Sequence, residues 1–410
     1  PEPEWLNQIT SAYENEEIAG VGGFVFDHTG YDLQYHYCLA DRLGDADVRL
    51  TEPTSHFSFP YSFRYPHFLG TNATFRRSVL VKINGFDEEY EYHLDETDVC
   101  LRIIDAGYVL KQIDQAYVHH RYAPSHVRTH NKVITYHYPF IKNRIYFYLK
   151  HAQAYCSQED WLHIQEAYIN HFRNGVRAAI NSNQLNEQAL EKFEIDIAKA
   201  ITDGYKRGHE GVTAQLTPDK IAKNAGPFKT FPTKNPCDFL TIVFIFREYA
   251  QQEASSKILN FIKNISAELA HSGHIVHIIT QSQDINRVDW IDGVWVHHIL
   301  NDSNFDLPIK PQKIPKDLWQ WSANALQEVN RIATHRQINI IEAPIKDVEG
   351  IAVGFCGKWP LITNLIDIEP KSISEIQQVL MGKSAWIRKT SQDPLLPDQF
   401  AIENWNKNKD

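Results

Sequence analysis

The sequence predicts an α/β protein in three parts. Residues 1 to about 150 mix strand-like runs with loops that are rich in His, Tyr and Pro, whereas residues 151–236 are largely helical and end in a linker. Residues 237–410 alternate short apolar strands with amphipathic helices. This alternation is typical of an open parallel sheet with right-handed crossovers. We therefore expect a mixed sheet with helices, a helical connector, and a parallel α/β lobe.

The first two parts differ in their hydrophobic periodicity. Strands are expected at 21–26 and 108–113, where apolar residues lie close together. A helix is expected after residue 151, because apolar residues recur there at the spacing of one helical face. This stripe comprises Trp161, Ile164, Tyr168 and Phe172. One glycine and three prolines within 224–236 indicate a linker.

The third part begins with an apolar run at 239–246, as expected of a strand buried on both faces of a parallel sheet. The helix that follows carries its apolar residues on one face. They are Ile258, Phe261, Ile262, Ile265 and Leu269. This helix is expected to end at Gly273, because glycine suits the left-handed C-terminal cap. Further strands are expected at 275–280, 338–343 and 360–365.

Composition argues against several classes of protein. The 41 Lys and Arg against 51 Asp and Glu give a formal net charge of −10, which argues against general nucleic-acid binding because that needs a basic face. No apolar run reaches the roughly 18 residues that span a bilayer. The five cysteines are scattered, so a reducing cytoplasm is expected.

The chain starts at Pro1 and has one methionine, Met381, so we expect it to be a piece of a longer protein.

Three carboxylates crowd the predicted start of a helix in the first part. They are Asp95, Glu96 and Asp98. The apolar face of this helix comprises Val99, Leu101, Ile103 and Ile104. Carboxylates at a helix N-terminus are stabilised by the helix dipole, which is one explanation for the cluster. The other explanation makes one carboxylate a general base that accepts a proton from an attacking hydroxyl.

Neighbouring motifs favour the general base. The run at 70–77 reads GTNATFRR, the run at 85–88 reads GFDE, and the run at 94–102 reads LDETDVCLR. In this order they resemble the C-terminal half of family-two inverting glycosyltransferases, which have the GT-A fold. Asn84 replaces the first glycine of that family's G-G-F-D-E pattern, and Asp95-Glu96 replaces its E-D pair. The resemblance covers residues 1–150.

The resemblance implies roles for individual residues. Glu96 falls on the family's catalytic base, and Asp95 would be its partner. Asp98 and Arg102 would hold the helix in place, with Arg102 also counted among the substrate-binding residues. The turn that lines the sugar and acceptor pocket would contain Gly70, Thr71 and Asn72.

Two adjacent histidines follow. On a strand, His119 and His120 would point to opposite faces, and a structural role is one reading of each. In the resembled family a histidine near this point completes a divalent-metal site (Mn²⁺ or Mg²⁺) at the donor diphosphate, and Arg121 matches the geometry of phosphate oxygens. The D-x-D motif with the main metal ligands is expected upstream of Pro1. Because a hard cation needs several oxygen ligands, donor binding by this half alone is expected to be poor.

The basic and aromatic run at 138–150 allows two interpretations. It is either a helix packed in the core with Lys142, Arg144 and Lys150 solvated, or a surface helix that touches a membrane. The second interpretation would place lipid-linked acceptors nearby.

The third part contains a second group of motifs. They are REY at 247–249, GHIVH at 273–277, DGVWVH at 292–297 and EAPIKDVEG at 342–350. Together they resemble the N-terminal Rossmann-like lobe of family-four GT-B glycosyltransferases. Ser255-Ser256 replaces the family's glycine pair, and Ile366 stands where a histidine is expected.

Three acidic residues of this lobe are the candidate ligands for a substrate. They are Glu253, Asp347 and Glu349. We expect each near the carboxyl end of a strand, where open α/β sheets bind ligands.

The motifs predict the middle of a tandem glycosyltransferase. Residues 1–150 would be the C-terminal half of a GT-A domain, 151–236 a connector, and 237–410 a GT-B lobe. The expected reaction transfers a hexosyl-type sugar from a nucleotide diphosphate-sugar to a saccharide or lipid-linked acceptor in bacterial polysaccharide or glycoconjugate synthesis. It would take place in the cytoplasm or at the inner face of the plasma membrane.

Two alternatives to this reading are open. The chain could be a non-catalytic acceptor-binding or scaffolding piece. A generic α/β nucleotide-binding enzyme is the other alternative, although the sequence lacks both G-x-G-x-x-G and a P-loop.

Overall fold

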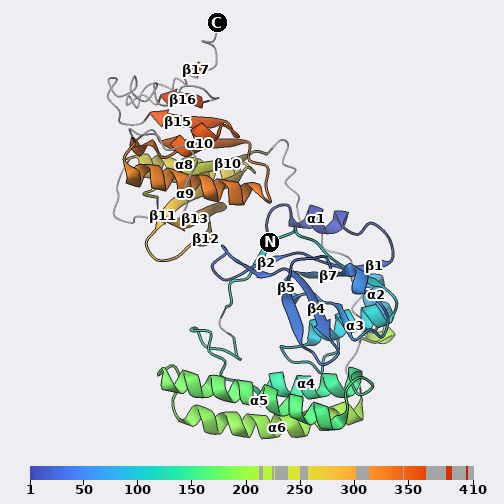
Figure 1. Cartoon of the computed structure of the whole chain (residues 1–410). Coiled ribbons are helices and arrows are strands. Elements are labelled where there is room, and N and C mark those ends of the chain that lie inside the picture. The colour runs from blue at the N-terminus through green and yellow to red at the C-terminus, as the bar shows by residue number, and fades with distance from the viewer. Residues whose placement is uncertain are drawn as a thin grey trace. The chain divides into compact units, whose positions relative to one another are not determined.

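The computed structural model divides the chain into two compact units, residues 1–230 and 231–410 (Figure 1). It describes residues 1–123, 125–211, 216–223, 226, 239–249, 257–301, 314–344, 346–365, 385–389 and 403–404. Both units combine helices with sheets, so the predicted α/β class is confirmed. Most of the predicted linker at 224–236 lies outside the described residues.

The first unit contains three small sheets, with the strand orders β7-β1-β8, β3-β2-β9 and β5-β4-β6. The bounds are Ile18–Gly22 (β1), Val25–Phe26 (β2), Leu33–Tyr35 (β3), Tyr37–Asp41 (β4), Ala46–Leu50 (β5), Arg64–Pro66 (β6), Ala73–Phe75 (β7), Val109–Gln112 (β8) and Val118–His119 (β9). β1 is parallel to β8, and β2 is parallel to β9. The other pairings in these sheets are antiparallel.

The strand predicted at 21–26 is interrupted. It forms the end of β1 and all of β2, with Gly23 and Phe24 between them. A Cβ atom on Gly23 would lie 2.3 Å from the carbonyl oxygen of Ala116. Glycine therefore lets the chain pass close to the backbone that leads into β9.

Helices cover these sheets and form a separate layer. Their bounds are Trp5–Ser11 (α1), Arg77–Lys82 (α2), Asp95–Asp105 (α3), Tyr138–His151 (α4), Gln158–Asn181 (α5), Gln188–Glu210 (α6) and Pro218–Lys223 (α7). Short 3₁₀ turns lie at Ser55–Phe57 (η1) and Gly70–Asn72 (η2). The predicted helical character of 151–222 is confirmed by α5, α6 and α7.

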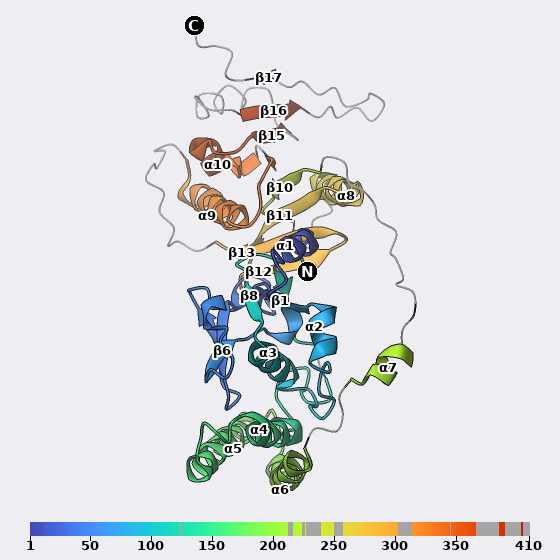
Figure 2. The ribbon, with the colours of Figure 1, turned by 90° about the vertical axis from the view of Figure 1, so that its right-hand side faces the viewer.

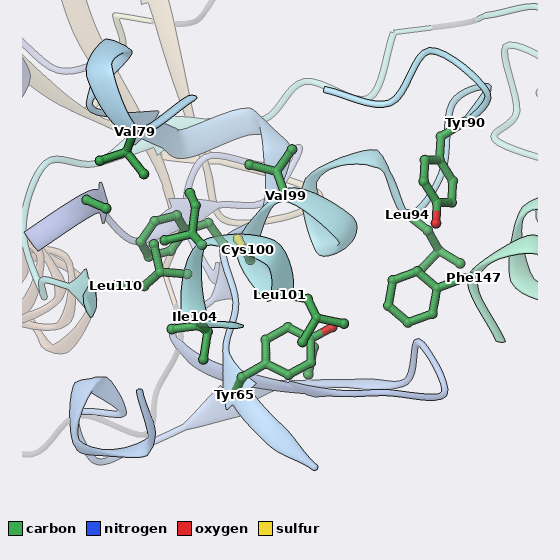
Figure 3. Packing of buried hydrophobic residues seen from close by; sticks show 14 of the residues in the cluster. Tyr65, Val79, Tyr90, Leu94, Val99, Cys100, Leu101, Ile104, Leu110 and Phe147 are labelled. Carbon is green, nitrogen blue, oxygen red and sulfur yellow. The ribbon is translucent and has the colours of Figure 1, made fainter. Parts of the chain in front are cut away.

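α3 is the centre of the first unit's core. Its predicted apolar face is buried completely, together with Cys100. Figure 3 shows Leu101 beside Tyr65 of β6 and Ile104 near Leu110 of β8, and it shows Phe147 of α4 beside Leu94. Because side chains pack against α3 on several sides, its N-terminus is held in one place relative to the sheets.

α4, α5 and α6 lie side by side in Figure 2. Their shared core contains the predicted stripe: Trp161 is fully buried, and Ile164, Tyr168 and Phe172 pack against the cluster. The Trp161 ring stacks on Tyr148 of α4 with 4.1 Å between ring centroids. These three helices therefore pack as part of the first unit, although α5 and α6 fall in the predicted connector.

The prediction that the cations of α4 are solvated is wrong. Lys142 and Arg144 are 6% and 4% exposed, and Lys150 is nearly as buried. Arg144 forms a bidentate pair with Asp45 at 2.7 Å. Buried cations need such partners because desolvation is costly.

A membrane-facing surface is equally inconsistent with this helix, since most of its residues are buried. Among the described residues, no helix is both long and apolar enough to cross a membrane.

Gly204 permits close packing of α6 on α4. A Cβ atom there would lie 2.9 Å from Cβ of Ile145 and 3.0 Å from the carbonyl oxygen of Lys142. We expect Gly204→Val to lower the free energy of unfolding by about 1–3 kcal/mol through overpacking, as measured by urea titration with circular dichroism. Gly175→Val is the matched control, because nothing lies within 4 Å of that position. Equal stability of the two variants would refute this account of the interface.

The second unit is built on one eight-stranded sheet with the order β12-β13-β11-β10-β14-β15-β16-β17. The bounds are Thr241–Ile245 (β10), Ile275–Ser282 (β11), Arg287–Ile291 (β12), Val294–Leu300 (β13), Ile340–Pro344 (β14), Leu361–Leu365 (β15), Ala385–Lys389 (β16) and Glu403–Asn404 (β17). Among the described strands of this sheet, only β12 and β17, at its edges, are antiparallel to their neighbours. The parallel strands follow the doubly wound, Rossmann-like order, with the reversal between β10 and β14.

Helices lie on both faces of this sheet. They are Lys257–His271 (α8), Lys316–Ala333 (α9) and Ile351–Cys356 (α10), with a 3₁₀ turn at Lys346–Val348 (η3). α8 and α9 flank the sheet from opposite sides in Figure 2. The predicted strands and the predicted helix of this lobe are confirmed to within a few residues.

A buried chain of hydrogen bonds joins the sheet to α9. Arg336 can only donate, so Nε2 of His277 accepts at 2.8 Å and its Nδ1 carries the proton. That proton is donated to Nε2 of His297 at 2.8 Å, and Nδ1 of His297 donates to Glu328. Burial lowers the pKa of both imidazoles, although Glu328 opposes this at His297. The chain therefore requires two neutral histidines and fixes the position of α9.

Candidate active site

The acid pair lies at the first turn of α3. Leu94, which precedes Asp95, has φ = 69° and its side chain is 3% exposed. A left-handed conformation is unusual for leucine and persists only where packing holds it. Burial of Leu94 in the core cluster provides that packing and directs the chain into the helix.

Glu96 is a half-buried carboxyl with few partners. Its Oε1 accepts a hydrogen bond from the backbone N–H of Gly70 at 3.3 Å, and its side chain is also hydrogen bonded to Asp95. Burial raises the pKa of Glu96 to about 8, with a further increase from the hydrogen bond and charge of Asp95. A carboxyl group with a raised pKa is a stronger base once it is deprotonated, as a general base requires.

Asp98 has a different role from its two neighbours. It is fully buried and contacts Arg102, Lys150 and His151 at 2.6–2.7 Å. Burial alone would raise the pKa of Asp98, but these three groups hold it well below its ordinary value. Asp98 therefore stays ionised and fixes α3 against α4.

Arg102 does not fit the predicted contact with substrate. Its Nε donates to Asp98, and its two terminal nitrogens donate to the carbonyl oxygens of Ile83 and Gly85, all at 2.7 Å. These bonds occupy the guanidinium within the protein. Arg102 holds α3 in place, as the resemblance also implied.

The aspartate of the GFDE motif joins the same network. Asp87 accepts hydrogen bonds from Tyr146 at 2.8 Å and from Lys150 at 2.7 Å. Two carboxylates, Asp87 and Asp98, thus face two cations, Arg102 and Lys150, in the core. No local sequence pattern indicates this pairing, because Lys150 and His151 lie about fifty residues after Asp98.

The turn η2 lies beside the acid pair. Gly70 and Thr71 are exposed, so this edge of the site is open to solvent. Asn72 is 3% exposed and does not fit the predicted contact with substrate. Its amide donates to the carbonyl oxygens of Phe24 and Ala116, and its Oδ1 accepts from Trp5. Asn72 therefore ties η2 to the segments that lead into β2 and β9.

His67 is a buried residue behind the acid pair that the sequence analysis missed. Its Nε2 lies 3.1 Å from Oγ1 of Thr97, and its Nδ1 lies 3.3 Å from Sγ of Cys38. Burial lowers the pKa of His67 to about 3, so the ring is neutral. It supports the first turn of α3 without adding charge near Glu96.

The two predicted metal-site histidines take separate partners. His119 lies on β9, contacts Glu2 at 3.0 Å through Nε2, and stacks on Phe26. His120 contacts Gln34 at 3.0 Å through Nδ1. Arg121 follows β9 and is exposed. The expectation that His119 and His120 use different faces of the strand agrees with these contacts.

The described residues do not by themselves fit a divalent metal ion. Glu2 and His119 offer two ligands, and no cluster of three or more His, Cys, Asp or Glu side chains suited to a metal occurs in the described part of the chain. Mn²⁺ and Mg²⁺ favour more oxygen ligands than this pair provides. We derive no step through a metal.

In the second unit, Glu349 lies where the strand order reverses. Its Oε2 accepts from the backbone N–H of Arg247 at 2.6 Å and from the indole of Trp321 at 3.0 Å. Burial raises its pKa to about 8. The carboxyl group therefore ties the end of β10 to the segment after β14, and this role is structural.

Of the two further candidates in this lobe, the structure describes Asp347 but not Glu253. Asp347 has φ = 59° in η3 and is followed by Val348 with φ = 47°. Consecutive left-handed residues of this kind mark a strained backbone. Glu253 lies outside the described residues, as do Ser255, Ser256 and Ile366.

The comparisons with known proteins do not assign the chain to a family. No protein-family model matches the chain, and no curated protein matches it. Among solved structures, the chain is similar to sucrose-phosphate synthase from Thermosynechococcus elongatus, at 11% sequence identity and a TM-score of 0.28. The match covers 37% of this chain and 42% of that chain, so it spans less than half of the neighbour. A similarity this slight decides neither family nor function.

Proposed function

We propose that the first unit transfers a sugar from a nucleotide diphosphate-sugar to a hydroxyl acceptor, with Glu96 as the general base. The observation that carries this proposal is the half-buried Glu96 carboxyl at the start of α3, next to Asp95 and to the exposed turn at Gly70. The order of the motifs around it supports the same reaction.

The proposed reaction balances as an inverting displacement. Glu96 accepts the proton of the acceptor hydroxyl, and the hydroxyl oxygen forms a bond to the anomeric carbon. The bond between that carbon and the diphosphate oxygen breaks, and the diphosphate leaves with the electron pair. A divalent metal, Mn²⁺ or Mg²⁺, is still the predicted cofactor.

A panel of nucleotide sugars tests this function. The 410-residue chain is incubated with saccharide acceptors and with UDP- and GDP-sugars at millimolar concentration, because its donor binding is expected to be poor. The incubations are done with and without Mn²⁺, and products are detected by mass spectrometry after long incubation. Thermal stabilisation by one sugar nucleotide, together with a transferred product, would support the proposal. Saccharide binding without transfer under any condition would contradict it and favour a non-catalytic acceptor-binding piece.

Asp95→Asn is expected to shift the pH profile of the reaction. The pKa of Glu96 is about 8 partly because Asp95 raises it, and kcat/KM should therefore rise with pH towards a plateau above about 8. Removing the charge of Asp95 should move this rise in kcat/KM to lower pH. The shift should be partial, because desolvation still raises the pKa of Glu96. The profile of log kcat/KM against pH measures the shift. An unmoved limb would show that Asp95 does not influence the base.

A further inference from the structure

The loop between β9 and α4 carries Arg128 and Lys132 and contains no Asp or Glu. Packing and backbone hydrogen bonds hold the middle of this loop. Val127 is fully buried, and its carbonyl oxygen accepts from the N–H of Thr135 at 2.9 Å. Arg128 pairs with Ser125 across the turn. The backbone at Arg128 is therefore fixed within the loop.

The guanidinium of Arg128 contacts two tyrosine rings. Its Cζ atom lies 5.8 Å from the ring centroid of Tyr92, which precedes α3, and 5.8 Å from that of Tyr122, which follows β9. Such cation–π contacts hold the cation without pairing its N–H groups with an oxygen atom. Nε is buried and has no hydrogen-bond partner, and no carboxylate in the described part of the chain forms an ion pair with Arg128. An anionic oxygen would satisfy these donors.

Two further cations lie near the same ring. Nζ of Lys132 is 5.5 Å from the centroid of Tyr122. Burial raises the pKa of Tyr122, and Arg49 of β5 is among the cations that oppose this effect. Arg49 and Lys132 are both exposed, and neither forms an ion pair with another residue that the structure describes. Three cations without carboxylate partners therefore lie near Tyr122.

The carboxylates closest to these cations have other partners. Asp27 accepts a hydrogen bond from the N–H of Thr29 at 2.9 Å and lies 3.7 Å from Nδ1 of His28. Glu91 contacts His126 at 3.4 Å. Neither carboxylate forms an ion pair with a described Arg or Lys. The positive charge near Tyr122 is therefore in excess.

Two neighbouring histidines are affected by the same cations. The ring of His120 lies 4.4 Å from that of Tyr122, between centroids. Burial lowers the pKa of His120, and Arg128 lowers it further. Burial and Arg49 act in the same way on His36. Both imidazoles are therefore neutral at pH 7, and an anion would meet the Arg and Lys charges alone.

We propose that Arg128, Lys132 and Arg49 bind a phosphate group of a ligand. The guanidinium matches two phosphate oxygens, and the lysine ammonium adds a compact charge. Through Arg128 the loop packs on Tyr92, three residues before α3. Binding here does not depend on the proposed transfer reaction. The phosphate group belongs either to a nucleoside diphosphate or to a sugar phosphate, and the experiment distinguishes the two sources.

Calorimetric titrations of the 410-residue chain in EDTA test the proposal with pyrophosphate, UDP and glucose 1-phosphate. Uridine and glucose are the phosphate-free counterparts. Arg128→Gln should weaken binding of the preferred phosphate ligand about 10- to 100-fold, because hydrogen bonds to a charged group are lost. Arg128→Lys should recover only part of this affinity, because lysine lacks the planar guanidinium. Arg177→Gln removes an exposed arginine of α5 and should leave binding unchanged.

The order of affinities identifies the source of the phosphate group. Tighter binding of UDP than of glucose 1-phosphate would assign the site to a nucleoside diphosphate, and the reverse order would assign it to a sugar phosphate. In both cases uridine and glucose should bind more weakly than their phosphate-bearing counterparts.

Three outcomes would overturn the proposal. One is no heat of binding for any of the phosphate ligands at millimolar concentration. Another is unchanged binding in both Arg128→Gln and Lys132→Gln, once thermal unfolding shows that these variants are folded. The third is equal weakening by Arg128→Gln and Arg177→Gln, which would indicate attraction to overall charge instead of a site in this loop.

Discussion

Replacing Glu96 with glutamine is expected to reduce sugar transfer by a factor of about 10²–10⁴, the usual contribution of a general base. The amide keeps the size of the carboxyl and can still accept a hydrogen bond from the N–H of Gly70. It cannot take a proton from the acceptor hydroxyl. The loss should therefore appear in kcat, with little change in the affinity for acceptor.

The control for this variant is Glu16→Gln, which changes a carboxylate that is 91% exposed. Its turnover should match that of the unmodified chain. Retention of full turnover by Glu96→Gln would exclude Glu96 as the base. A rise in KM with unchanged kcat would give Glu96 a binding role instead.

Asp98→Asn is expected to have the largest effect on stability. The substitution would leave Arg102 and Lys150 in the core with only Asp87 to balance them. Removing one partner of a buried ion pair costs about 3–5 kcal/mol, because the remaining charge stays desolvated. Urea unfolding monitored by tryptophan fluorescence measures the loss.

A double variant separates charge from packing. Adding Lys150→Met to Asp98→Asn removes the excess cation and should recover part of the lost stability. Equal stability of the single and double variants would mean that the charge of Lys150 does not matter to α3. A single variant as stable as the unmodified chain would contradict the whole network.

The sequence was sufficient to predict the central strands and α8 of the second unit. The apolar strands around Val243 and Ile278 and the one-sided helix α8 give local signals that agree with their packing. The hairpin of β12 and β13 was not predicted as strands, although Asp292-Gly293 at its turn is a recognised hairpin signal.

The first unit was harder to predict because its decisive contacts are distant in sequence. Lys142 and Lys150 look like solvated cations in a window of α4 alone. Their partners Glu89, Asp87 and Asp98 lie on loops and helices more than fifty residues earlier. No periodicity reports such pairs, so burial of these cations could only come from the structure.

In the candidate site too, features that depend on local sequence could be predicted, and features that depend on distant contacts could not. The proximity of Asp95 and Glu96 at the start of a helix follows from local sequence, and their roles are still proposals. The structural use of Asn72 and Arg102, and the support from His67, depend on segments that meet only after folding. The residue types thus indicated where a reaction is expected. They did not indicate which side chains already form hydrogen bonds within the protein.

The most direct test of the raised proton affinity of Glu96 needs no substrate. Free energies of unfolding are measured by urea titration from pH 4 to pH 9 for the unmodified chain and for Glu96→Gln. A carboxyl whose pKa is raised from 4.5 to about 8 by folding stabilises the protein fully below its unfolded pKa, and this stability is lost as the pH rises to its folded pKa. The variant should therefore gain relative stability steadily between about pH 5 and pH 8 and stay level above that. Parallel curves over the whole range would contradict the account, because Glu96 would then titrate as an ordinary solvated carboxylate.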